Sequence, residues 1–173
     1  MFSVLAVVVA TTLSSCGLIA PLLRAAVPLA GVKLAFACLP EESMIDTPAG
    51  PRRVRDLTAG DVVTGYRGKP VLIQQKHVDQ EQPETEFLRA VFDDGASVEA
   101  CGRHRVAGTR MQDLAVGQLV AGRRVLAVTS RRGLTRSCDL LTEDEGYRIS
   151  GIPVNSMIEE MHAAAAGRPR ARN

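Results

Sequence analysis

Residues 53–65, RVRDLTAGDVVTG, recur in altered form as residues 110–122, RMQDLAVGQLVAG, and this internal repeat decides the expected fold. The two stretches align without gaps and share six of thirteen residues: an Arg, an Asp-Leu pair, a Gly, a Val and a final Gly. Such a pattern describes a turn that leads into a strand. Two copies are too few for a solenoid, which needs about three units. The repeat therefore predicts two related β-subdomains with pseudo-twofold symmetry, and chance similarity of short turn motifs is the alternative.

The chain from Cys38 onward has the pattern of an all-β fold. Short apolar runs alternate with Gly, Pro, Asp and charged residues, and no long 3.6-residue periodicity is present. The expected strands are residues 54–57, 61–66, 71–78, 86–92, 98–105, 118–128, 137–141 and 147–154. The tail, residues 157–173, begins with a helix-like stretch, MIEEMHAAAA, and ends in a basic, Pro-containing segment expected to be frayed or disordered.

Composition limits the classes of function. The chain has 173 residues, 46% of them hydrophobic, which is enough for one domain with a core and short appendages. A net charge of +2, 3% aromatic residues and no Trp argue against a nucleic-acid partner, since both phosphate attraction and base stacking are weak.

The N-terminus has the features of an export signal. Residues 1–15, MFSVLAVVVATTLSS, are apolar and too short to span a membrane. The sequence LSSC that ends at Cys16 resembles a bacterial lipoprotein signal, in which the cysteine is acylated and becomes the new N-terminus. This resemblance implies an exported lipoprotein anchored to the membrane of the cell envelope through Cys16, with residues 16–37 as a linker near the membrane.

Two alternatives remain for this end of the chain. Cys16 is unmodified if residues 1–15 form part of a plain signal peptide. Residues 35–37, AFA, form an A-x-A pattern directly before Cys38 and favour ordinary signal-peptidase cleavage there. In that case the protein is secreted or periplasmic, and Cys38 is its first residue.

The four cysteines, Cys16, Cys38, Cys101 and Cys138, are widely spaced and form no CxxC pair, so they do not indicate a zinc site. In an exported protein a Cys101–Cys138 disulfide is an alternative that cysteine counting leaves open.

Several blocks together resemble the Hint (hedgehog/intein) family. The opening block is CLPEESMIDTP at residues 38–48, followed by VRDL at 54–57 and GDVV at 60–63. The T-x-x-H signature of the family corresponds to CGRH at 101–104, where Cys replaces Thr. The closing blocks correspond to DL at 139–140 and GIPVNS at 151–156.

The resemblance covers residues 38–156 and leaves no space for the endonuclease that large inteins carry. It implies a compact all-β Hint fold, with a duplicated pseudo-twofold β-structure and long curved strands, acting as an autoprocessing domain.

The resemblance also implies a role for each site residue. Cys38 attacks the carbonyl of Ala37 and converts the amide into a thioester by an N-to-S acyl shift, while His104 protonates the departing nitrogen. The family places assisting groups at Cys101 and Asp139. Ser156 is the second nucleophile, and Asn155 cyclises to release the C-terminal flank. These groups all belong to the chain, so self-processing requires no protein partner, cofactor or metal.

The departures from the family favour chemistry at the N-terminal end. The residue before the terminal Asn is usually His, and here it is Val154. Loss of such a group costs about 100-fold or more in rate, so C-terminal cleavage should be slow and splicing is less favoured than self-cleavage. The alternative is a catalytically degenerate Hint scaffold or binding module on a lipoprotein. In that interpretation His104 and Asp139 are satisfied polar residues, and Cys101 is a small buried apolar residue.

Overall fold

The computed structural model describes residues 39–80, 85–133 and 136–165. The chain divides into two units, residues 1–34 and 35–173, and the described residues all belong to the second. The expected signal segment and linker, with Cys16, Ala37 and Cys38, lie outside the described residues. No helix in the described part is long and apolar enough to cross a membrane.

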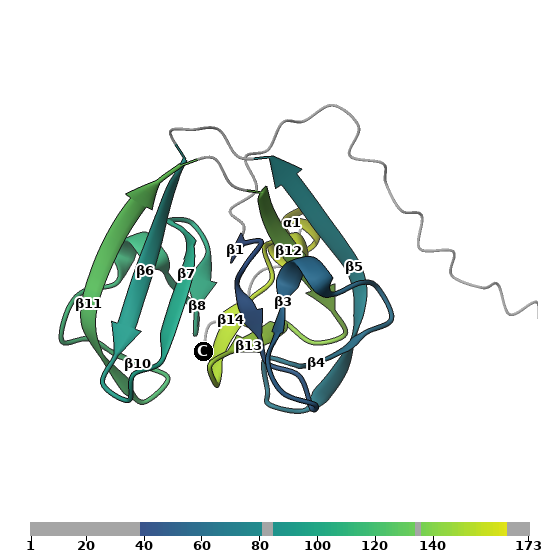
Figure 1. The fold of residues 1–173 in the computed structure, drawn as a ribbon, viewed down its shortest axis with the longest axis horizontal. Helices are drawn as coiled ribbons and strands as arrows, with labels where there is room; N and C mark the ends of the chain where they lie inside the picture. The colour runs from purple at the N-terminus through teal and green to yellow at the C-terminus, as the bar shows by residue number, and fades with distance from the viewer. Residues whose placement is uncertain (1–38, 81–84, 134–135, 166–173) are drawn as a thin grey trace, which may run out of the picture. The chain divides into compact units, whose positions relative to one another are not determined.

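The expected all-β architecture is confirmed (Figure 1). In chain order the elements are β1 (Leu39–Pro40), β2 (Met44–Ile45), β3 (Arg52–Arg53), the 3₁₀ helix η1 (Val54–Asp56), β4 (Val62–Thr64), β5 (Pro70–Gln80), β6 (Glu86–Phe92), β7 (Ser97–Cys101), β8 (Arg105–Val106), β9 (Thr109–Arg110), the 3₁₀ helix η2 (Met111–Asp113), β10 (Leu119–Val120), β11 (Arg123–Arg132), β12 (Arg136–Thr142), β13 (Gly146–Ile149), β14 (Ile152–Asn155) and the helix α1 (Met157–Ala165).

The two copies of the repeat fold alike. Each runs from a two-residue strand through a one-turn 3₁₀ helix and a turn into a second short strand. The prediction of a strand at residues 54–57 is therefore wrong: Val54–Asp56 form η1, which ends at Leu57, and η2 is its counterpart. Each 3₁₀ turn closes through a 3.3 Å hydrogen bond, from Leu57 N–H to the first carbonyl of η1 and from Leu114 N–H to that of η2. The turn buries two apolar side chains three residues apart, so burial favours the 3₁₀ conformation over an extended one.

The shared glycines are required by the turn. Gly60 and Gly117 adopt φ of +91° and +89°, a region that disfavours residues with a Cβ. Each donates its N–H over 2.8 Å to the long strand that comes next, at the carbonyls of Ile73 and Val125. The repeat thus preserves a backbone conformation and its hydrogen bond.

The structural repeat extends beyond the sequence repeat. Ser43 in the first half and His104 in the second each donate a backbone N–H over 2.9 Å to the residue three positions earlier. Their carbonyls each accept a 2.8 Å hydrogen bond from the first residue of η1 or η2. Ser43 and His104 therefore occupy equivalent positions, although no sequence similarity marks them.

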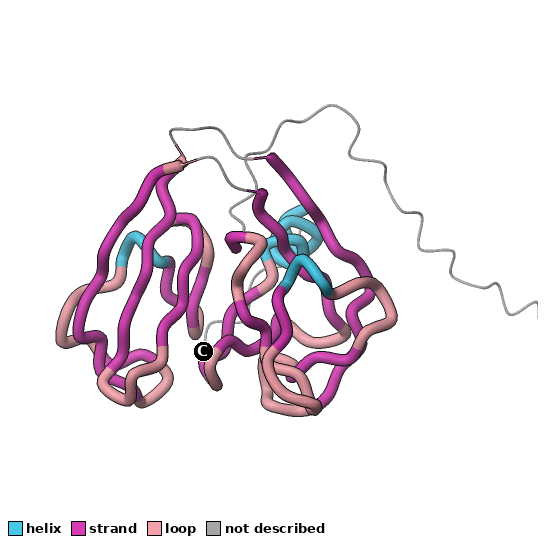
Figure 2. The backbone as a smooth tube through the Cα atoms, viewed as in Figure 1, coloured by secondary structure: helices cyan, strands magenta, loops and turns pink. Residues whose placement is uncertain are grey.

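The two halves exchange strands. The long strands β5 and β6 are consecutive in the chain but do not pair; β6 pairs with β11, and β12 pairs with β5. Figure 2, in the same view as Figure 1, shows β11 and β5 curving along the two outer sides, with their partners β6 and β12 inside them. Strand β6 follows the first copy of the repeat but pairs with β11 of the second, and β12 follows the second copy but pairs with β5 of the first, so the two halves are interdependent.

Two other expected strands are hairpins. Residues 118–128 contain β10 and β11, and residues 147–154 contain β13 and β14. The turns are Ala121–Gly122, with φ of +50° and +79°, and Ser150–Gly151, with φ of +51° and +74°. Two consecutive positive φ values match the tight turn whose twist suits a hairpin. Residues 98–105 likewise divide into β7 and β8.

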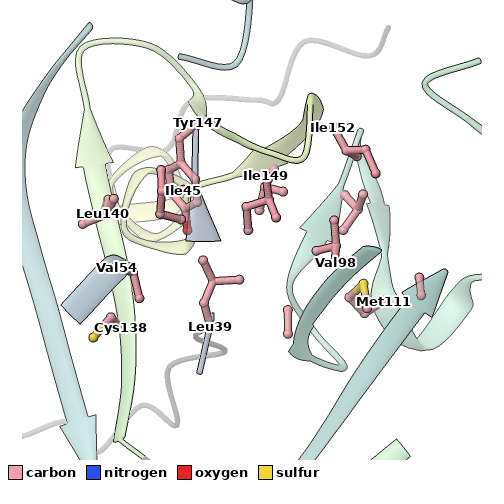
Figure 3. Packing of buried hydrophobic residues seen from close by; sticks show 14 of the residues in the cluster. Leu39, Ile45, Val54, Val98, Met111, Cys138, Leu140, Tyr147, Ile149 and Ile152 are labelled. Carbon is pink, nitrogen blue, oxygen red and sulfur yellow. The ribbon is translucent and has the colours of Figure 1, made fainter. Parts of the chain in front are cut away.

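One apolar core joins the halves. Figure 3 shows Leu39, Cys138 and Tyr147 facing Val98 and Met111 across it, and all five are buried. The strand that begins at Leu39 is therefore fixed by packing on both sides.

Candidate active site

The core contains a small set of buried polar side chains. Among the described residues these are His104, Ser137, Asp139, Thr142, Asn155 and Ser156. Four of the six are site residues expected from the sequence. Buried polar groups are stable only where hydrogen bonds replace water, so their partners define the site.

Asp139, on β12, accepts hydrogen bonds on both carboxylate oxygens. Oδ1 accepts from the Tyr147 hydroxyl at 2.7 Å and from the Leu140 backbone N–H at 2.9 Å. Oδ2 accepts from the backbone N–H groups of Met157 at 2.7 Å and Ile158 at 3.0 Å. A carboxylate has about four acceptor positions, so these donors account for its capacity and fix its orientation.

Burial and charge act in opposite directions on Asp139. Complete burial raises the pKa of its carboxyl group, while the positive charge of His104, the Tyr147 hydrogen bond and the backbone donors lower it. The effect of the His104 charge on this pKa links two residues from different sheets, because Asp139 lies on β12 and His104 follows β7.

His104 is fully buried and its backbone is held on both sides. It lies in the turn between β7 and β8, with its N–H bonded to the Cys101 carbonyl at 2.9 Å and its carbonyl bonded to Met111 N–H at 2.8 Å. Ser43, its counterpart in the first half, is only partly buried. The two halves have similar backbones at this position, but only the second half carries a buried imidazole there.

Asn155 and Ser156 are held at the end of β14. The Asn155 side-chain Oδ1 accepts a 3.1 Å hydrogen bond from Gly108 N–H. Ser156 donates its backbone N–H to the Glu145 carbonyl at 3.1 Å, and its Oγ accepts the Glu159 N–H at 3.2 Å. Ser156 is thus the N-cap of α1, with a glutamate three residues later as in a capping box.

Sequence reasoning missed Gly146 and Tyr147. Gly146 pairs with Asn155, and a Cβ added to it would overlap the Val154 carbonyl oxygen and lie 3.0 Å from the Ser156 nitrogen. Only glycine allows the backbone at position 146 to lie this close to the Asn155–Ser156 peptide bond. Tyr147 is fully buried, and as one of only two tyrosines in the chain it could have been singled out as a buried donor.

The N-terminal end of the domain lies beside these residues. Leu39, which is next to Cys38 in the sequence, pairs with Cys138, the neighbour of Asp139 on β12. Strand β1 also lies next to β7, which leads to His104 (Figure 1).

The disulfide that cysteine counting left open is not formed: Cys101 and Cys138 are both buried thiols among the described residues. They lie in different sheets, Cys101 paired with Phe87 and Cys138 with Val78. Burial raises the pKa of Cys138, which disfavours its thiolate. Within the described ranges, no three His, Cys, Asp or Glu side chains are grouped to hold a metal ion.

Comparisons with known proteins identify the fold. No protein-family model matches the sequence, and no curated protein matches it. Solved structures to which the chain is similar include the DnaB intein from Synechocystis sp. PCC 6803 (TM-score 0.58, 11% identity, 69% of this chain and 98% of that chain), the bacterial intein-like domain from Clostridium thermocellum (0.57, 17%, 69% and 97%) and the MchDnaB-1 intein (0.56, 18%, 68% and 98%).

The chain therefore has the Hint fold, as the sequence predicted. More narrowly, it has the compact form found in inteins and bacterial intein-like domains, without an endonuclease insert.

Proposed function

We propose that residues 38–156 form an autoprocessing domain that cleaves its own chain at the Ala37–Cys38 peptide bond. One observation carries this proposal: strand β1, which starts directly after Cys38, pairs with the strand of buried Asp139 and lies next to the strand that leads to buried His104. The segment directly after the expected nucleophile thus lies beside the strand that carries Asp139 and the strand that leads to His104.

The proposed reaction has two steps. The Cys38 sulfur attacks the Ala37 carbonyl carbon, the bond from that carbon to the Cys38 nitrogen breaks, and the nitrogen takes a proton from His104 to leave as an amine. An added thiol or water then attacks the thioester, takes the acyl group and returns the Cys38 thiol. The carboxylate of Asp139 stabilises the positive charge that His104 carries before it gives up the proton.

The test uses residues 17–173 with a different tag at each end. Addition of dithiothreitol should release a new N-terminal fragment that ends at Ala37. A Cys38→Ala chain is the matched control, because it keeps the fold and removes the sulfur. If the unmodified chain stays as intact as the control, the proposal is wrong.

A second function is favoured by one feature of the C-terminal junction. Val154, where the family usually has His, is fully buried in the apolar core and offers no proton-transfer group. This feature favours a Hint scaffold or binding module without catalysis, and a chain that stays intact with dithiothreitol would support it.

The position at which the export signal is removed decides whether the Ala37–Cys38 bond is present for the reaction. An acylated Cys16 at the N-terminus leaves the Ala37–Cys38 bond in place on a membrane-anchored protein, whereas signal-peptidase cleavage before Cys38 removes it. The mass of the mature protein from bacterial cells distinguishes the two: we expect a lipid-modified chain beginning at Cys16, and a chain beginning at Cys38 would contradict the proposed reaction.

A further inference from the structure

Helix α1 begins directly after the C-terminal junction and binds the site through its first turn. The backbone N–H groups of Met157 and Ile158 donate to Asp139 Oδ2 over 2.7 and 3.0 Å, and Ser156 caps the helix. Hydrogen bonds to a charged group are among the stronger ones in proteins. The segment that cleavage at Asn155–Ser156 would release is therefore attached to the candidate active site.

Side chains of α1 add to this attachment. Ile158 is buried, Met157 packs against Phe87 and Cys101, and Glu160 forms a 3.4 Å ion pair with Arg105. The ion pair is about four-fifths buried on both sides. These contacts lie on β6, β7 and β8, so α1 is anchored to more than the strand of Asp139.

The same contacts hold the Asn155–Ser156 bond. Asn155 is paired in β14 with Gly146, and Ser156 is fixed through its N–H to the Glu145 carbonyl. Release requires the Asn155 side-chain nitrogen to attack its own backbone carbonyl carbon, which breaks the bond to the Ser156 nitrogen and transfers a proton to it. The backbone must rotate out of the strand conformation for this ring to close. Fixed residues on both sides of the bond oppose that rotation.

We propose that α1 inhibits cleavage at Asn155–Ser156, because its first turn is bound to Asp139 and holds Ser156 in place, so that residues 156–173 stay attached. The inference concerns the junction at the other end of the site from the proposed cleavage at Ala37–Cys38, and it rests on the proposed function only in treating this fold as self-processing.

Met157→Pro tests the contact with Asp139. Met157 is the first residue of α1, a position where proline is favoured in helices. The substitution removes the N–H that donates to Asp139 along with the Met side chain. Met157→Ala is the matched control, because it removes the side chain and keeps the N–H. Both are made in a full-length Cys38→Ala chain, so that N-terminal chemistry does not contribute.

The measurement is release of residues 156–173 by intact mass, with amide hydrogen exchange of α1 recorded in parallel. We expect release at least about tenfold faster from Met157→Pro than from Met157→Ala, and faster exchange of the α1 amides. Equal release from the two variants overturns the role of the Asp139 contact.

Ile158→Asp is a second way to detach the helix, since it places a charge in a buried position. If α1 exchanges freely in this variant and no tail is released, the proposal is overturned. Tail release from these variants, with no cleavage at Ala37–Cys38 in the unmodified chain, would contradict the proposed function and leave this inference standing.

Discussion

At the scale of single residues, the buried carboxylate of Asp139 organises the site. An isolated buried charge is costly, and four hydrogen bonds from β12, β13 and α1 offset that cost here. Because the donors come from three elements, the carboxylate links β12, β13 and α1 through hydrogen bonds.

Tyr147→Phe should raise the pKa of Asp139 further, because it removes a donor that stabilises the carboxylate. A carboxyl group whose pKa is raised on folding contributes most stability below its unfolded pKa, near 3.8, and loses that contribution as pH rises through the folded pKa. The variant should therefore lose more stability at neutral pH, about 1–3 kcal/mol, than in acid.

Urea unfolding at several pH values, with carboxyl NMR titration, checks this prediction. Tyr66→Phe is the control, because it makes the same chemical change in a partly buried tyrosine outside the cluster. A loss of stability that is the same at all pH values would contradict it.

At the scale of elements, the β13–β14 hairpin sets the position of the C-terminal junction. Its tight Ser150–Gly151 turn fixes the register, which places Gly146 opposite Asn155. The glycine lets the two backbones approach more closely than any side chain would allow.

Gly146→Ala should destabilise the protein by about 3 kcal/mol and displace the junction, since the added methyl overlaps backbone that cannot move away as a side chain could. Thermal unfolding and the amide exchange of Ser156 measure the two effects. Gly102→Ala is the control, because its Cβ would meet mainly the Gln112 side chain at 3.2 Å. Equal stability of the two variants would show that the hairpin adapts.

At the scale of the whole described domain, exchanged strands and a shared core make the two halves one folding unit. Strand β12 completes the sheet of β5, and β6 completes that of β11, so neither half retains its pairing alone. Leu57 and Leu114 occupy equivalent buried positions in the two copies of the repeat, so the same substitution can be compared in each half.

Leu57→Ala and Leu114→Ala should each lower the free energy of unfolding by about 2–5 kcal/mol, because each leaves a cavity in the core. Each variant should still unfold in one transition, with far-ultraviolet circular dichroism and tyrosine fluorescence coinciding. Two separate transitions in either variant would mean that the halves unfold independently.

Local residue patterns were sufficient to predict the all-β class and the duplication. The resemblance to Hint domains singled out His104, Asp139, Asn155 and Ser156; the fold buries all four, and their chemical roles stay predictions. Local patterns did not predict the 3₁₀ helices or the hairpin turns at Ala121 and Ser150, where non-glycine residues adopt positive φ. Local patterns misled there because burial and strand twist decide the backbone conformation.

The donors that surround Asp139, and the attachment of helix α1 to that carboxylate, became evident only in the folded chain. Tyr147, Gly146 and the first turn of α1 are site components through strand pairing and helix packing, which join residues distant in sequence. A repeat can be read along the chain because it is a local pattern. The environment of a buried charge depends on every element that packs around it, and so it is set by the tertiary structure.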